Sequence, residues 1–102
     1  MFRVLIADDE KPIVEGLKVF INWEKLGFEI AGEAYNGQVG LEAAEKLMPH
    51  VVITDIRMPL LDGLAMIDKI KAFNPECRFI ILSGYSDFEY ARQGIVYGAF
   101  DY

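Results

Sequence analysis

Three short apolar runs, rich in β-branched residues, restrict the fold of this chain more than any other feature of its sequence. They occupy residues 4–7 (VLIA), 51–53 (VVI) and 79–82 (FIIL). A strand with one solvated face alternates apolar and polar residues, and none of these runs does so. Each run is therefore expected to be a strand that is buried on both faces, in the interior of a sheet.

Two other stretches are expected at the margins of the same sheet. Phe28–Ala34 alternates apolar and polar residues, which predicts an edge strand with Glu29 and Glu33 together on one face. The last four residues, 99–102, are expected to begin a fifth strand.

Amphipathic helical patterns separate these expected strands. A capping box of Ser86 and Glu89 predicts the start of a fourth helix. Strand and helix thus alternate along the chain, which is typical of a parallel sheet with helices on both faces. With the apolar runs in the middle, we expect an α/β fold: a doubly wound five-stranded parallel sheet in the order 2-1-3-4-5. The stripes of the first three helices are Ile13, Leu17, Phe20 and Ile21; Leu41, Ala44 and Met48; and Leu64, Met66, Ile67 and Ile70.

Acidic and hydroxyl side chains follow the apolar runs where the strands are expected to end: Asp8 and Asp9, then Asp55, then Ser83. Ligands of doubly wound sheets bind outside these carboxyl ends, where the strand order reverses. Crowded carboxylates repel one another, and Mg²⁺, which prefers oxygen ligands, relieves the repulsion. The pattern predicts a Mg²⁺–carboxylate site in which an aspartate attacks a phosphoryl group. The alternative is that Asp9 merely caps the next helix.

Charge and cysteine content limit the partners of the chain. Ten Lys and Arg against 16 Asp and Glu give a net charge of −6, which argues against direct binding to nucleic acid or to an anionic membrane. Cys77 is the single cysteine and cannot form an internal disulfide, which favours a reducing compartment. No apolar run approaches the roughly 18 residues of a membrane-spanning helix. We expect one soluble cytoplasmic domain with no membrane partner.

The residues at the strand ends also carry a family resemblance. Asp8-Asp9, the stretch DIRMPLLDG at residues 55–63, and Ser83-Gly84 are similar to the receiver domain of bacterial two-component response regulators. The resemblance covers essentially the whole chain. It implies a flavodoxin-like receiver domain over residues 1–102 that accepts a phosphoryl group from a sensor histidine kinase and is not an enzyme.

The resemblance also implies a role for each matched residue. Asp55 becomes the phosphoacceptor. Mg²⁺ is bound by the carboxylates of Asp9 and Asp55 and by the backbone carbonyl of Arg57, while Asp8 acts mainly through water. Ser83 and Tyr102 become the switch residues that respond to phosphorylation.

Finer features are similar to one branch of the family. The long connection at residues 22–28 and the stretch GYSDFEYA at residues 84–91 resemble receivers that precede AraC-type helix-turn-helix domains. DNA is then expected to be bound only through an output domain that this chain lacks. The family places a lysine and a fifth helix after the position of Tyr102, so the chain is expected to be truncated there. The apolar surface left uncovered predicts a homodimer.

Two other functions fit the same fold. The first alternative is a small Mg²⁺-dependent phosphohydrolase with an aspartyl-phosphate intermediate. It needs a general acid two residues after the nucleophile, where this chain has Arg57. The second is a flavodoxin-like FMN carrier, which needs a phosphate-binding loop after the first strand. The acidic residues 8–10 disfavour that alternative.

Overall fold

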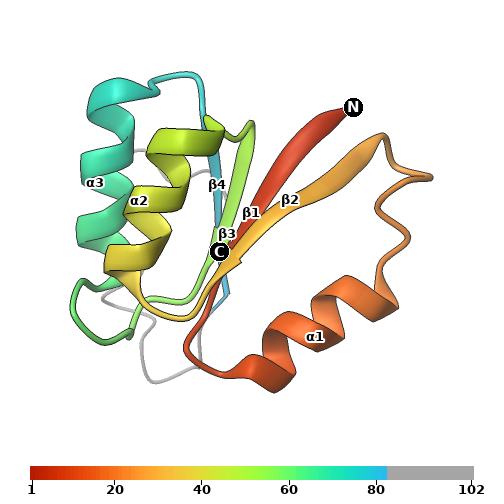
Figure 1. The fold of residues 1–102 in the computed structure, drawn as a ribbon, viewed down its shortest axis with the longest axis horizontal. Helices are drawn as coiled ribbons and strands as arrows, with labels where there is room; N and C mark the ends of the chain where they lie inside the picture. Colours follow the sequence, from red (N-terminus) through yellow and green to blue (C-terminus); the bar gives the residue numbers. More distant parts are fainter. Residues whose placement is uncertain (83–102) are drawn as a thin grey trace.

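The computed structural model describes residues 1–82, which form strands and helices in strict alternation (Figure 1). Residues 83–102 lie outside the described residues, and with them the expected fourth helix, the expected fifth strand and the predicted switch residues Ser83 and Tyr102. The elements are β1 (Phe2–Ala7), α1 (Lys11–Phe20), β2 (Phe28–Ala34), α2 (Gly37–Leu47), β3 (Val51–Thr54), α3 (Gly63–Phe73) and β4 (Arg78–Ile81).

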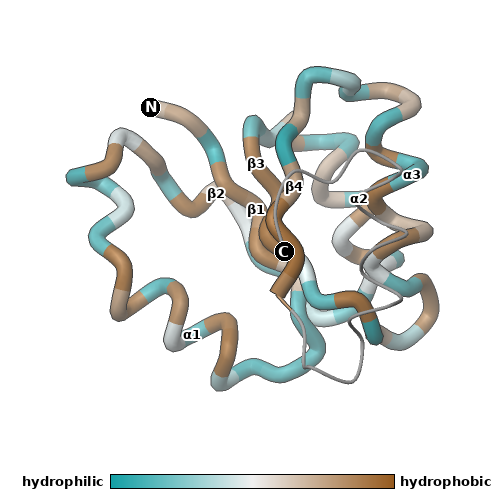
Figure 2. The backbone as a smooth tube through the Cα atoms, turned by 180° about the vertical axis from the view of Figure 1, so that it is seen from behind, coloured by the Kyte–Doolittle hydropathy of each residue, from teal (hydrophilic) through white to brown (hydrophobic). Residues whose placement is uncertain are grey.

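All strand pairs of the described sheet are parallel, and the strand order is β2-β1-β3-β4. This order confirms the prediction for the first four strands. The first two apolar runs lie in the middle of the sheet as expected, because β1 and β3 are adjacent with Leu5 opposite Val52 and Ile6 opposite Ile53. The third run forms β4, the last strand of the described sheet. In Figure 2 the strands β1, β3 and β4 form the most apolar part of the chain.

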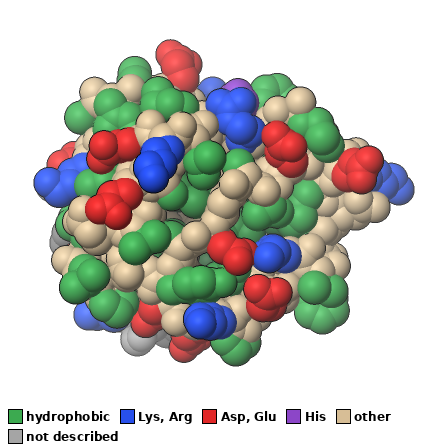
Figure 3. All heavy atoms as spheres, viewed as in Figure 1, with side chains coloured by type: hydrophobic (Ala, Val, Ile, Leu, Met, Phe, Trp, Pro, Cys, Tyr) green, Lys and Arg blue, Asp and Glu red, His purple; other side chains and the backbone are tan. Residues whose placement is uncertain are grey.

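Helices cover both faces of the sheet, as a doubly wound fold requires (Figure 1). α2 and α3 pack together on one face, over a core that includes Leu5, Val52 and Phe79. α1 lies on the other face, over a smaller core of Val4, Ile6, Val14 and Ile53. No helix within residues 1–82 is both long and apolar enough to cross a membrane. Acidic and basic side chains are interspersed on the face drawn in Figure 3.

The predicted apolar stripe of α1 is partly wrong. Val14 is fully buried and Leu17 packs against the same core, whereas Ile13 is 42% and Phe20 87% exposed. The reason is rotation about the helix axis. Residues 14, 17 and 21 share one face at the spacing i, i+3, i+7, and Ile13 and Phe20 lie one residue, or about 100°, away from that face.

The edge strand β2 contains a bulge that the alternating sequence does not reveal. Its register against β1 shifts between Val4, which pairs with Ile30, and Leu5, which pairs with Gly32. The extra residue reverses which side chains face α1. Glu29 and Glu33 therefore lie on opposite faces, and the prediction that they share a face is wrong.

Glu33 uses its position on the α1 side to join the helix to the sheet. Its Oε2 lies 2.9 Å from the Nζ of Lys18 in α1, and Tyr35 donates a hydrogen bond from its hydroxyl to the Oε1 of Glu33 at 3.2 Å. The hydrogen bond to Lys18 lowers the pKa of Glu33. The ammonium of Lys11 lies 5.2 Å from the centre of the Tyr35 ring. The first and last turns of α1 are thus both tied to the end of β2 and the residue that follows it.

Candidate functional site

Three carboxyl groups meet at the carboxyl end of the two central strands. Asp8 and Asp9 follow β1, Asp55 follows β3, and one oxygen of each lies within 4.8 Å of the others. Asp8 is buried, Asp55 is half-buried and Asp9 is exposed. The predicted convergence of the two strand ends is therefore present in the structure. The third predicted strand end, at Ser83, lies outside the described residues.

Backbone hydrogen bonds between strands fix the positions of these carboxyl groups. The Asp55 N–H donates to the carbonyl of Ala7, and the Asp8 N–H donates to the carbonyl of Ala34, both at 3.0 Å. The two hydrogen bonds extend the pairing of β1 with β2 to Asp8 and the pairing of β3 with β1 to Asp55, one residue beyond the end of each strand. The acidic residues therefore sit on rigid backbone although they lie outside the strands.

Asp8 has the most perturbed carboxyl group of the cluster. Burial raises its pKa to about 6, and the negative charges of Asp55 and Asp9 add to the effect. A hydrogen bond that its Oδ1 accepts from the Glu10 N–H at 2.9 Å opposes the rise. The site thus holds more negative charge than the protein alone stabilises, which is the electrostatic condition for binding a cation.

The alternative role of Asp9 as a helix cap is not found. α1 begins after Glu10, whose own side chain makes no capping hydrogen bond. Asp8, one residue before Asp9, supplies the acceptor for the Glu10 N–H. Asp9 is thereby left at the surface, beside Asp8 and Asp55.

An open hollow of ≈ 590 Å³ lies over the exposed side of the cluster. Its walls are Asp9 and the loop between β3 and α3, namely Arg57, Met58, Pro59 and Asp62. The hollow is large enough to admit a phosphoryl group.

The loop between β3 and α3 is held at both ends by hydrogen bonds. Asp62 caps α3, because its Oδ1 accepts from the Ala65 N–H at 2.8 Å. The Gly63 N–H donates to the carbonyl of Ile56 at 2.7 Å. A Cβ atom at Gly63 would overlap the carbonyl oxygen of Asp55. The stretch at residues 55–63 is therefore a compact turn around Asp55.

The sequence did not indicate two features of this loop. Leu60 has a φ of 70°, in the left-handed region, and its side chain is 81% exposed. Gly37, at the start of α2, packs directly against Leu61. Asn36-Gly37 carries a signal for a helix start, and the Asn36 side chain does cap α2, but nothing in the sequence links it to residues 59–61.

The donor set of the cluster fits Mg²⁺. The three side chains offer only carboxylate oxygens, within 4.8 Å of one another. Mg²⁺ prefers such hard ligands and retains several waters, for which the exposed side at Asp9 leaves room. Asp8, Asp9 and Asp55 are the residues that would hold the ion. Ligation by the Arg57 carbonyl stays a prediction.

Comparison with known proteins identifies relatives over the full length of the chain. The family model for the response regulator receiver domain matches residues 4–102. The uncharacterized transcriptional regulatory protein YesN of Bacillus subtilis (strain 168) is 44% identical over all 102 residues. The chain spans 28% of the length of YesN.

Solved structures agree with this assignment. The receiver domain of AraT, a response regulator from Geobacillus stearothermophilus, superposes with a TM-score of 0.95 at 37% identity, over 99% of this chain and 78% of that one. A two-component transcriptional regulator, AraC, from Clostridium phytofermentans superposes with a TM-score of 0.90 at 39% identity, over 99% and 79%. The chain belongs to the response regulator receiver domain family, whose members are regulatory phosphoacceptor domains rather than enzymes.

Proposed function

We propose that this receiver domain is a switch that accepts a phosphoryl group on Asp55 from a sensor histidine kinase, with Mg²⁺ bound at Asp8, Asp9 and Asp55. One observation carries the proposal. Asp55 follows a central strand and is only half-buried, and its carboxyl group lies within 4.8 Å of those of Asp8 and of Asp9, which borders the open hollow. An incoming phosphoryl group can therefore reach the Asp55 carboxyl group from solvent.

The reaction is the transfer of a phosphoryl group between two side chains. An oxygen of Asp55 forms a bond to phosphorus while the bond from phosphorus to the kinase's histidine nitrogen breaks, and the released imidazole takes up a proton. Mg²⁺, when bound, supplies charge stabilisation to the phosphoryl oxygens. The Ile56 N–H donates to the Oδ1 of Asp55 at 2.7 Å and orients the carboxyl group. We propose Ser83 and Tyr102 as the residues that respond to the acyl phosphate.

The output of the switch is proposed to be transcription. The related regulator YesN extends well beyond the matched region, since the chain spans 28% of its length. The solved neighbours include a transcriptional regulator called AraC. We therefore propose that residues 1–102 act as the receiver domain of a cytoplasmic regulator whose separate output domain binds DNA.

Phosphorylation of matched variants tests the proposal. Wild-type protein, Asp55→Asn and Asp62→Asn are incubated with Mg²⁺ and acetyl phosphate, and the intact mass is measured. Asp62 lines the same hollow, and asparagine retains its capping bond. We expect one phosphoryl group on the wild type and on Asp62→Asn, and none on Asp55→Asn. A phosphorylated Asp55→Asn variant would disprove the assignment.

A further inference from the structure

The corner between β2 and α2 packs unusually closely on the loop that follows Asp55. Gly37 is buried, and its N–H donates to the carbonyl of Pro59 at 3.4 Å. A Cβ atom at Gly37 would overlap the carbonyl oxygen of Leu61 and lie 2.6 Å from its carbonyl carbon. The overlap is with backbone, which cannot rotate away as a side chain can. Only glycine is therefore compatible with this approach of the two segments.

The loop on the other side of this contact has an unfavourable conformation. The Leu61 N–H donates to the Pro59 carbonyl at 2.8 Å, across Leu60 with its φ of 70°. This geometry is a γ-turn with a positive φ, a rare and strained form. The Leu60 side chain is 81% exposed, so its own packing does little to stabilise the turn. Such a conformation persists where neighbouring structure holds it, and Gly37 is the neighbour that contacts both ends of the turn.

The same corner is also joined to the acidic residues after β1. The carbonyl of Ala34, the last residue of β2, accepts from the Asp8 N–H at 3.0 Å. Between Ala34 and Gly37, the Asn36 side chain accepts from the Val39 N–H at 2.8 Å and anchors the start of α2. The corner thus bridges the two chain segments that carry the carboxyl groups of the site.

We propose that Gly37 is a positioning residue for the Mg²⁺ and phosphoryl site. Its missing side chain lets the β2–α2 corner close on residues 59–61. That contact sets the distance between Asp9 and the loop that carries the Arg57 carbonyl, two residues before Pro59. The inference rests on the proposed function of the acidic site, and it adds a residue that touches neither the metal nor the phosphoryl group.

Gly37→Ala tests the inference, with Gly32→Ala as the matched control. A Cβ atom at Gly32, inside β2, would lie 2.8 Å from the Cδ1 of Leu47, so this variant crowds a movable side chain and leaves residues 59–61 alone. We expect Gly37→Ala to weaken Mg²⁺ binding about tenfold, as loss of a supporting contact to a metal site does. We also expect faster amide exchange at residues 57–61 in the metal-free variant. Gly32→Ala is expected to change neither property.

Two results would overturn the inference: unchanged Mg²⁺ affinity and loop exchange in Gly37→Ala, or an equal change in Gly32→Ala. If Gly37→Ala does not fold, Mg²⁺ titration of the wild type decides instead. The amide chemical shift of Gly37 should then change with the same Mg²⁺ midpoint as the amide chemical shift of Asp55. A Gly37 amide whose chemical shift does not change with Mg²⁺ overturns the inference. Loop exchange without metal does not depend on phosphorylation. It therefore separates failure of this inference from failure of the Asp55 assignment.

Discussion

At the scale of single residues, the buried carboxyl group of Asp8 makes the stability of the metal-free domain depend on pH. Its pKa is about 6 in the folded protein against an ordinary value of 3.8. The folded state therefore keeps the Asp8 proton at pH values where the unfolded chain has lost it. The Asp8 carboxyl group therefore makes its full contribution to the free energy of unfolding below about pH 4. This contribution is lost as the pH rises through 6.

We predict that Asp8→Asn stabilises the metal-free domain at pH 7.5 by roughly 2 kcal/mol, because the amide is buried without a charge and keeps an acceptor for the Glu10 N–H. At pH 4 the gain should vanish. Denaturant unfolding at the two pH values, without Mg²⁺, measures the difference. Asp68→Asn, at an exposed position of α3, serves as the control and should show no such pH-dependent gain. An equal gain at both pH values would contradict the burial argument.

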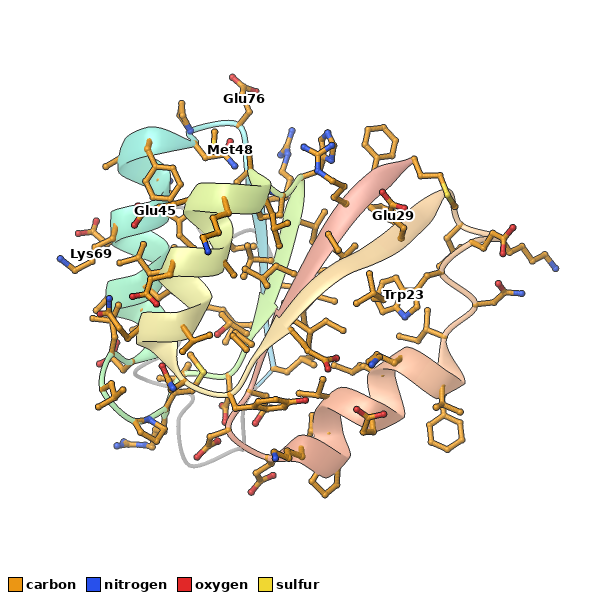
Figure 4. All side chains as sticks on the ribbon, in the orientation of Figure 1. Trp23, Glu29, Glu45, Met48, Lys69 and Glu76 are labelled. Atoms are coloured by element: carbon orange, nitrogen blue, oxygen red, sulfur yellow. The ribbon has the colours of Figure 1, made fainter. Side chains whose placement is uncertain are left out.

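At the scale of elements, Trp23 fixes the long connection between α1 and β2. Its Nε1 donates to the carbonyl of Leu17 at 3.0 Å, one of the last carbonyls of α1, and its ring meets Phe28 edge-on with centroids 6.4 Å apart. Figure 4 shows Trp23 between the connection and β2. Trp23 thus anchors the connection to both α1 and β2.

We predict that Trp23→Phe destabilises the domain by about 1 kcal/mol through loss of this hydrogen bond, and that amide exchange in the last turn of α1 becomes faster. Denaturant unfolding and residue-resolved exchange provide the two measurements. Phe20→Leu changes an 87% exposed aromatic side chain on the same helix and should alter stability by no more than about 0.5 kcal/mol. Equal effects of both substitutions would show that the hydrogen bond contributes nothing.

The order of the elements followed from the sequence because short apolar runs rich in β-branched residues favour strands covered on both faces. The orientation of two elements did not follow. Ile13 and Phe20 of α1 are as apolar as Val14 and Leu17, so the buried face depends on how the helix is rotated against the sheet. Likewise the bulge in β2 leaves the alternating pattern of Phe28–Ala34 intact while it changes the face of Glu33.

The candidate site could be predicted to a similar degree. The Asp8, Asp9 and Asp55 cluster follows from the strand order, because parallel strands end at the same edge of the sheet. The contact between Gly37 and residues 59–61 joins segments that are more than 20 residues apart and has no periodic signature. It depends on how α2 and α3 pack together, which only the three-dimensional structure shows.

At the scale of the whole molecule, Mg²⁺ is expected to stabilise the folded domain, because it binds the assembled carboxyl groups and not the unfolded chain. At 100 times the dissociation constant the gain is about 2.7 kcal/mol. The melting temperature should rise with Mg²⁺ concentration, and more strongly above pH 6, where Asp8 is ionised. Thermal unfolding across a Mg²⁺ series measures the effect. Asp9→Ala should remove most of the response, and a response that survives this change would place the ion elsewhere.

The bulge in β2 has a further consequence for crowded conditions in a cell. β2 is the outermost strand of the described sheet on its side, and an open strand edge is a template on which another chain can add and fibrils can grow. The register shift opposite Val4 and Leu5 interrupts the regular spacing that such growth needs. Deletion of Ala31 would restore an even edge while leaving Glu33 opposite Ile6, on the side of Lys18. A single inserted residue thus protects this edge of the sheet against the addition of another chain.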